Sequence, residues 1–220
     1  MVRKIKTEPV SGARHYESPV RRAKARATER RIIDAAATLY TAHGYVATSL
    51  AAVADRADVD PRTVYKVFGS KVGLLSRLVD IAMVGDQEAV PVADRTWAAD
   101  AFGADSAKVR VRAFAAIVRQ VMASAGWAFR IAAQAAAADA EAAALWATGQ
   151  RHRLEDATRF VEVLRQADLL RPGLSPRDAI ATVWLVSSPE TFIQLVDGLG
   201  LTLGRYERWV ERTLLDALVD

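Results

Sequence analysis

The chain has 220 residues, of which 51% are hydrophobic and 25% are charged, a balance that suits a globular protein with a sizeable core. It contains no cysteine, which excludes disulfide bonds, thiolate zinc sites and cysteine nucleophiles. The net charge of +4 is unevenly placed, because residues 1–71 hold 14 Lys/Arg against 7 Asp/Glu and residues 72–220 hold 16 against 19. The basic front indicates contact with a polyanion, although a solvated terminal tail would give the same count.

The N-terminal segment, residues 1–25, is polar and basic and has no hydrophobic period. We expect a flexible basic arm there. Its first ten residues, MVRKIKTEPV, lack the apolar run of a signal peptide. The longest uncharged run, residues 35–54, contains polar and turn-forming residues, so it is not a membrane span. We therefore expect a soluble protein of the cytoplasm.

Four helices are predicted between residues 26 and 86, because apolar residues recur there at helical spacing. The second and third are short and are separated by a tight polar turn. Their ends follow from residues that favour helix termini. These are Thr28 as the first N-cap, Gly44 as the first end, Thr48 or Ser49 as the second N-cap, Pro61 in the first turn of the third helix, Gly69 at its end, and Ser70 as the fourth N-cap.

The pattern stays helical beyond residue 86, and no strand alternation or internal repeat is found. We predict a connection at 87–97, helices at about 105–124, 127–137 and 139–167, a break at 169–176 (LLRPGLSP), and helices at 176–198 and about 202–217. The predicted fold is all-α, with an N-terminal three-helix helix-turn-helix DNA-binding domain and a C-terminal helical bundle. We place the arm at 1–25, the DNA-binding domain at 26–72, and a ligand-binding and dimerisation domain at 73–220.

The third predicted helix, PRTVYKVF, has the composition of a helix that enters the DNA major groove. Val64 and Phe68 would face inward, which leaves Arg62, Thr63 and Lys66 to meet DNA. Arginine can bond a guanine edge with two hydrogen bonds, and threonine offers a hydroxyl or a methyl group. The residues placed to bond phosphate are Tyr65, Lys71, Thr48 and Ser49. For all of these, a solvated helix face is the alternative interpretation.

Residues 30–75, RRIIDAAATLYTAHGYVATSLAAVADRADVDPRTVYKVFGSKVGLL, resemble the N-terminal domain of TetR-family transcriptional regulators. The resemblance covers about residues 25–80. It implies a two-domain, all-α homodimer that binds a palindromic operator, most often as a repressor that a small ligand releases. By this resemblance, base reading falls on Pro61, Arg62 and Thr63, and phosphate contacts fall on Thr48, Tyr65 and Lys71. The sequence departs from the family at Val67, which replaces a polar residue that can touch phosphate.

The C-terminal half resembles the family more weakly, in the segment WLVSSPETFIQLVDGLGLTLGRYERWVERTLLDAL. The last two helices of such regulators usually form the dimer interface. The resulting interface candidates are Leu195, Leu199, Tyr206, Trp209, Val210 and Leu214. Aromatic residues usually fill a core, but some could line the pocket of an apolar effector. The pocket candidates are Phe114, Met122, Trp127, Phe129, Trp146, Trp184 and Phe192.

Other classes of function remain open to different degrees. Within the arm, Arg21, Arg22, Lys24 and Arg26 either reach DNA or belong to a disordered tail. A sequence-independent architectural DNA-binding protein is the main alternative, and it would show little preference among sequences at fixed salt. A helical interaction module without DNA binding is disfavoured by the basic front. The three histidines share no metal-ligand spacing and GLGLTLG is not a dinucleotide fingerprint, so we expect no enzyme, no metal and no cofactor.

Overall fold

The structure, a computed structural model, describes residues 19–84 and 99–219, and these residues form α-helices and no β-strand. This confirms the predicted all-α class. The elements are α1 (Pro19–Ala47), α2 (Leu50–Arg56), α3 (Pro61–Phe68), α4 (Lys71–Val84), α5 (Ala99–Gly103), α6 (Ala107–Ala138), α7 (Ala140–Gln166), α8 (Pro176–Val186), α9 (Pro189–Phe192), a π-helical segment η3 (Ile193–Gly198), and α10 (Leu203–Leu218). The predicted connection at residues 87–97 lies outside the described residues.

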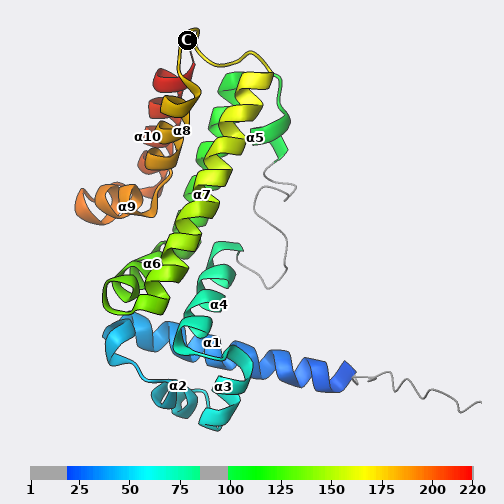
Figure 1. Cartoon of the computed structure of the whole chain (residues 1–220), viewed down its shortest axis with the longest axis vertical. Helices are drawn as coiled ribbons and strands as arrows, with labels where there is room; N and C mark the ends of the chain where they lie inside the picture. Colours follow the sequence, from blue (N-terminus) through cyan, green and yellow to red (C-terminus); the bar gives the residue numbers. More distant parts are fainter. Residues whose placement is uncertain (1–18, 85–98, 220) are drawn as a thin grey trace, which may run out of the picture.

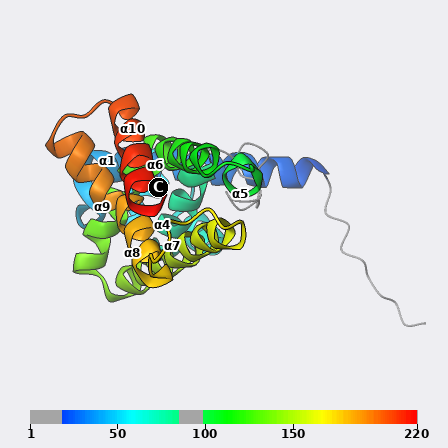
Figure 2. The same ribbon diagram turned by 90° about the horizontal axis from the view of Figure 1, so that it is seen from above.

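The molecule is elongated, with α2 and α3 at one end of its long axis and α8 and α10 toward the other (Figure 1). The long helices α6 and α7 run between the two ends. Viewed from above, the first turns of α1 project beyond the rest of the helices (Figure 2). No single helix among the described residues is long and apolar enough to cross a membrane. Among the same residues, α8 and residues 189–198 taken together have the length and apolar composition of a membrane span, but the chain bends by 48° between them.

Helix α1 begins at Pro19, so the predicted N-cap at Thr28 is wrong. The segment from residue 19 to residue 28 contains alanine, arginine and lysine, which are strong helix formers, and these propensities extend the helix backwards. Residues 19–25 are therefore helical, where an arm without secondary structure was expected. At the other end the helix is broken at Gly44, whose φ of 79° is a backbone conformation that glycine adopts without strain.

The two short helices begin where the sequence predicted. The Ser49 side chain accepts a hydrogen bond from the Ala52 N–H at 3.1 Å, which fixes the start of α2. Asp60 accepts from the Arg62 N–H at 2.7 Å, and Pro61 occupies the first turn of α3, where a missing N–H costs nothing. These bonds satisfy backbone donors that would otherwise lack partners.

The C-terminal bundle differs from its prediction in two places. Helix α6 is one continuous helix, where two were expected, because the run Ala123–Gly126 continues the helix despite its glycine. Conversely, the helix expected at 176–198 ends at Val186, and a new one starts at Pro189. A proline inside a helix removes a hydrogen bond and its ring clashes with the preceding turn, which explains the break.

Helix α6 takes part in both hydrophobic cores. Its first half packs with α7, α8 and α10 around Phe114, Phe160 and Tyr206. Its last turns pack with α1 and α4, where Ile131 lies in the same buried cluster as Leu75. The hydrophobic cluster around Leu75 therefore joins residues of α1, α4 and α6.

Candidate nucleic-acid interface

Helix α3 is held by one fully buried residue and presents the rest of its surface outward. Val64 is 0% exposed, and Phe68 is partly buried on the same side. Pro61, Arg62 and Lys66 are exposed and Thr63 is half-buried, while Tyr65 is 56% exposed. The predicted division between an inner and an outer face of this helix is therefore present in the structure. The outer face also includes Val67, 45% exposed, which can offer only apolar contact.

Thr48 is not available for a phosphate. It is 3% exposed, and its hydroxyl donates to the Gly44 carbonyl oxygen at 2.9 Å. Its N–H is bonded to the Tyr45 carbonyl oxygen at 3.3 Å. The prediction for Thr48 is corrected: the residue closes the end of α1. Ser49 is exposed and uses only its acceptor lone pair in the N-cap, so its O–H remains able to donate outward.

Lys71 is half-buried and lies in a cluster that the sequence did not reveal. Its ammonium lies 4.1 Å from the centre of the Tyr45 ring and donates to the Val46 carbonyl oxygen at 3.4 Å. The Tyr45 hydroxyl donates to Asp139 Oδ2 at 3.2 Å, across 94 residues of sequence. Burial lowers the pKa of Lys71, and the nearby Asp139 carboxylate opposes that shift. The ammonium has three donors, so two remain for a phosphate at this corner.

Asp139 joins the N-terminal helices to the turn between α6 and α7. It also caps α7, accepting from the N–H groups of Glu141 at 2.9 Å and Ala142 at 3.2 Å. The pKa of Asp139 is lowered, chiefly by the Ala142 N–H and next by the Tyr45 hydroxyl. Burial, followed by this carboxylate, raises the pKa of Tyr45, so the phenol stays protonated and donates. The position of Asp139 directly after an alanine run is a local signal for a helix cap, but its bond to Tyr45 has no local signal.

Two further polar contacts attach the helix-turn-helix to the rest of the chain. The Ser70 hydroxyl donates to Glu141 Oε1 at 3.1 Å, and its oxygen accepts from the Gly73 N–H at 3.0 Å. Arg77 of α4 pairs with Glu29 of α1 at 2.9 Å. These contacts fix α4 against α1 and against the α6–α7 corner, so the orientation of α3 depends on both.

The four basic residues predicted to form an arm lie on the first turns of α1. Arg21, Arg22, Lys24 and Arg26 are all exposed. The helical geometry puts Arg22, Arg26 and Arg30 on one stripe, at intervals of four residues.

Residues 32–78 match the family model described as "Bacterial regulatory proteins, tetR family". The N-terminal domain of this chain is therefore a TetR-family DNA-binding domain. A curated relative, the HTH-type transcriptional repressor BdcR of Escherichia coli (strain K12), is 44% identical over 62 residues. That match covers 28% of this chain and 30% of the relative, so the chain spans about a third of that repressor's length.

Solved structures share the TetR-family fold over most of the chain. A complex of SmeT with triclosan has a TM-score of 0.68 at 19% identity, covering 88% of this chain and 92% of that one. NalD, described as the secondary repressor of the MexAB-OprM multidrug efflux pump in Pseudomonas aeruginosa, has a TM-score of 0.65 at 18% identity, covering 89% and 98%. A protein from Saccharomonospora viridis in complex with choline has a TM-score of 0.64 at 12% identity, covering 87% and 97%.

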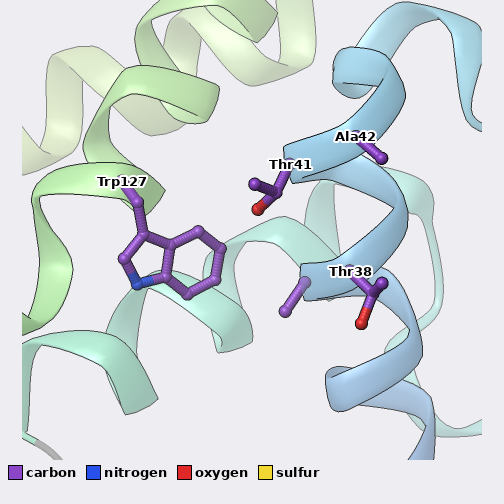
Figure 3. A pocket seen from close by; sticks show the side chains of 5 residues that line it. Thr38, Thr41, Ala42 and Trp127 are labelled. Carbon is purple, nitrogen blue, oxygen red and sulfur yellow. The ribbon is translucent and has the colours of Figure 1, made fainter.

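The predicted pocket residues of the C-terminal bundle do not gather around one hollow. Phe114, Met122, Phe129 and Phe192 are buried in the core of the bundle. Phe114 stacks on Phe160 with ring centres 4.1 Å apart. Trp127 instead lines an open hollow of about 490 Å³ between α6 and α1, opposite Thr38 and Thr41 (Figure 3). Trp146 and Trp184 are half-buried.

A cationic group lies beside this packed core. The Arg153 guanidinium donates to the Trp184 carbonyl oxygen at 2.6 Å and lies 5.3 Å from the indole ring. Burial lowers the pKa of Arg153, while Glu190 and then Tyr206 oppose the shift. Within the described residues, the Tyr206 hydroxyl and the Trp184 indole N–H are buried and have no hydrogen-bond partner. Buried polar groups are normally bonded, so these two donors suit a bound acceptor.

Three of the predicted interface residues are corrected by the structure. Tyr206, Val210 and Leu214 are 0% exposed, because they form the inner face of α10 at four-residue spacing. They cannot meet a second chain. Leu199 is 72% exposed, and Leu195 and Trp209 are half-buried, so these three keep surface for a partner. Leu185 on α8 is 59% exposed and was not predicted.

No group of three or more His, Asp or Glu residues in the described part of the chain is arranged to hold a metal ion.

Proposed function

We propose that this TetR-family chain is a sequence-specific DNA-binding repressor that acts as a homodimer and is released by a small molecule. The observation that carries the proposal is the outer face of α3, where Arg62 and Lys66 are exposed beside a 56%-exposed Tyr65 while Val64 fixes the helix from below. Such a helix fits the major groove, which is wide enough for an α-helix and presents a distinct donor and acceptor pattern for each base pair.

In this proposal, Arg62 and Thr63 read base edges, with Pro61 packing beside them. Tyr65, Lys66, Ser49 and Lys71 bond phosphates and fix the position of the helix without reading sequence. Two such helices in a dimer would lie about 34 Å apart, so the operator would be a near-palindrome.

Selection from random duplexes at fixed moderate salt tests the proposal. We expect an inverted repeat to be enriched. Arg62→Ala should lose about 1–3 kcal/mol of binding free energy for the preferred base at one position of each half-site, so the base preference there should relax. Lys71→Ala should weaken binding to all sequences alike and lower the slope of log K against log salt by about one for each half-site. Tight retention with no consensus would instead support the alternative of an architectural protein, and no retention in the absence of effector would refute both.

We propose that dimerisation uses the outer surface of α8, η3 and α10; α8 and α10 lie toward the end of the molecule away from α3 (Figure 1). Leu185 and Leu199, 59% and 72% exposed, are the apolar residues that a second copy would cover. Leu199→Glu should yield monomers in sedimentation velocity and weaken operator binding. The matched control is Leu154→Glu, because Leu154 is 47% exposed but lies on α7. Equal dissociation of both variants would contradict this interface.

We propose that an effector binds in the C-terminal bundle beside Arg153. Support comes from the two buried donors of Tyr206 and Trp184, and from relatives of this fold solved with triclosan and with choline. The packed rings around Phe114 and Phe192 favour a mainly apolar compound with one hydrogen-bond acceptor. A compound library screened by thermal shift should find ligands whose stabilisation falls in Tyr206→Phe and which release the operator. Ligands that stabilise without changing DNA affinity would contradict an effector role.

A further inference from the structure

The first turns of α1 form a helix that has no core of its own. Residues 20–27 are all exposed, and Val20, their only apolar residue other than alanine, is 75% exposed. Residues 20–28 carry four basic residues and no acidic residue. The first carboxylate along the helix, Glu29, is engaged by Arg77 at 2.9 Å. This part of α1, residues 19–28, is called here the basic extension.

A helix of this composition is poorly stabilised in water. Isolated helices shorter than about 12–15 residues are marginal even when rich in alanine. Arg22, Arg26 and Arg30 follow each other at four-residue spacing, where like charges repel. The basic extension therefore gains stability when an anionic surface neutralises its charges.

The spacing and position of these charges fit a DNA backbone. Four residues of helix rise about 6 Å, so Arg22 to Arg30 spans about 12 Å, and one DNA strand carries a charge about every 3.4 Å along the axis. The extension projects from the same end of the molecule that carries α2 and α3 (Figure 1). A membrane surface fits less well, because a helix that binds lipid needs an apolar face, and residues 20–28 offer only Val20 and alanines.

We propose that the basic extension binds the phosphate backbone of duplex DNA outside the base pairs that α3 reads, and that DNA stabilises it as a helix. The proposal rests on the proposed function, since it adds a second contact to the same DNA complex. In this proposal, Arg21, Arg22, Lys24 and Arg26 strengthen DNA binding without contributing to sequence preference.

The test compares the full chain with a variant in which these four residues are replaced by glutamine. The matched control replaces four exposed cations of the C-terminal domain and changes the net charge equally: Lys108, Arg151, Arg165 and Arg171. Affinity for the selected operator is measured over a range of salt concentrations. Each lost phosphate contact lowers the slope of log K against log salt by about 0.9, so a loss of two to four contacts lowers it by about 2 to 4.

The same measurements are made on a duplex with long flanks and on one trimmed to the selected repeat. We expect the slope to fall only for the α1 variant, and mainly on the long duplex. In the unmodified chain, hydrogen exchange should slow at the amides of residues 22–28 when the long duplex is added.

An unchanged slope in the α1 variant, with operator binding by the unmodified chain intact, would overturn this proposal and leave the proposed function standing. Equal changes in the α1 variant and the control would also overturn it, as an effect of net charge alone. A loss of binding to anionic vesicles without any change on DNA would assign the extension to a membrane and refute the proposal. Failure of the unmodified chain to bind any duplex would refute the proposed function itself.

Discussion

Gly126, in the middle of α6, is a position where one added methyl group would disturb the packing of the core. A Cβ atom there would lie 2.6 Å from Cε1 and 3.2 Å from Cδ1 of Phe192, both closer than side-chain atoms normally approach. The Phe192 ring has little room to withdraw, because it is 5% exposed and meets the Tyr206 ring edge-on with centres 5.1 Å apart. Gly126→Ala therefore pushes α6 and α9 apart or forces Phe192 out of its rotamer.

The size of the effect follows from two opposing contributions. Replacing a helical glycine by alanine favours the helix by about 0.8–1 kcal/mol. Overpacking of a close-packed core costs about 1–3 kcal/mol. Gly149, in the exposed interior of α7, provides the control, because a Cβ there meets nothing within 4 Å. Both substitutions gain the same helix propensity, so the difference between their free energies of unfolding measures the overpacking alone. Gly149→Ala should be more stable than Gly126→Ala by about 1–3 kcal/mol.

Urea unfolding at fixed protein concentration measures both variants. We expect Gly149→Ala to unfold at higher urea than the unmodified chain, and Gly126→Ala to unfold at lower or equal urea. Phe192→Leu in the Gly126→Ala background should recover part of the loss, since the clash is with the ring. Equal stabilisation by both alanines would refute the close contact between α6 and α9, and with it the packing of the core in which we place the effector.

Three further predictions concern the helix-turn-helix and its attachment. The pKa of Asp139 is lowered in the folded chain, so its contribution to stability is present above the ordinary pKa of 3.8 and is lost as pH falls through the folded pKa. Asp139→Asn should therefore be less stable than the unmodified chain at neutral pH, and the two free energies of unfolding should converge in acid. A difference that stays constant with pH would refute this linkage. Gly69 has φ 73° and ψ −51°, which side chains avoid, so Gly69→Ala should cost about 1–3 kcal/mol of unfolding free energy and weaken operator binding, and an unchanged midpoint would contradict the turn. Val64→Ala removes two methyl groups from a fully buried site and should cost about 2 kcal/mol by urea unfolding, where a neutral result would mean that α3 is not held by this residue.

The helix-turn-helix could be predicted closely because its signals are local. Ser49 and Asp60 mark helix starts through bonds made within three residues, and Pro61 suits the first turn of α3. Gly44 and Gly69 mark helix ends through backbone angles that other residues resist. Such cues need no knowledge of the rest of the chain. The inward placement of Val64 followed from helical spacing alone.

The errors arose where a residue's role depends on distant partners. Thr48 looked like a phosphate ligand, but the chain bends at Gly44 and turns the Thr48 hydroxyl onto that carbonyl oxygen. Tyr206 looked like an interface residue, but the apolar stripe of α10 to which it belongs packs inward, where its ring meets Phe192. The bond between Tyr45 and Asp139 joins residues 94 apart, so no local pattern could reveal it.

Helix α6 is the element through which an effector in the C-terminal bundle would act on α3, because α6 contributes residues to both hydrophobic cores. Its first half packs with α10 and its last turns pack with α4 and α1. Backbone hydrogen bonds make a helix resist bending, and α6 is continuous from Ala107 to Ala138 although it contains Gly126. In the proposed mechanism, a compound that tilted α6 near Tyr206 would also shift Ile131 against Leu75, and at the α6–α7 corner it would shift Asp139 against Tyr45. The spacing of two recognition helices can respond to such a compound only if it binds the two tilts of α6 with different affinity.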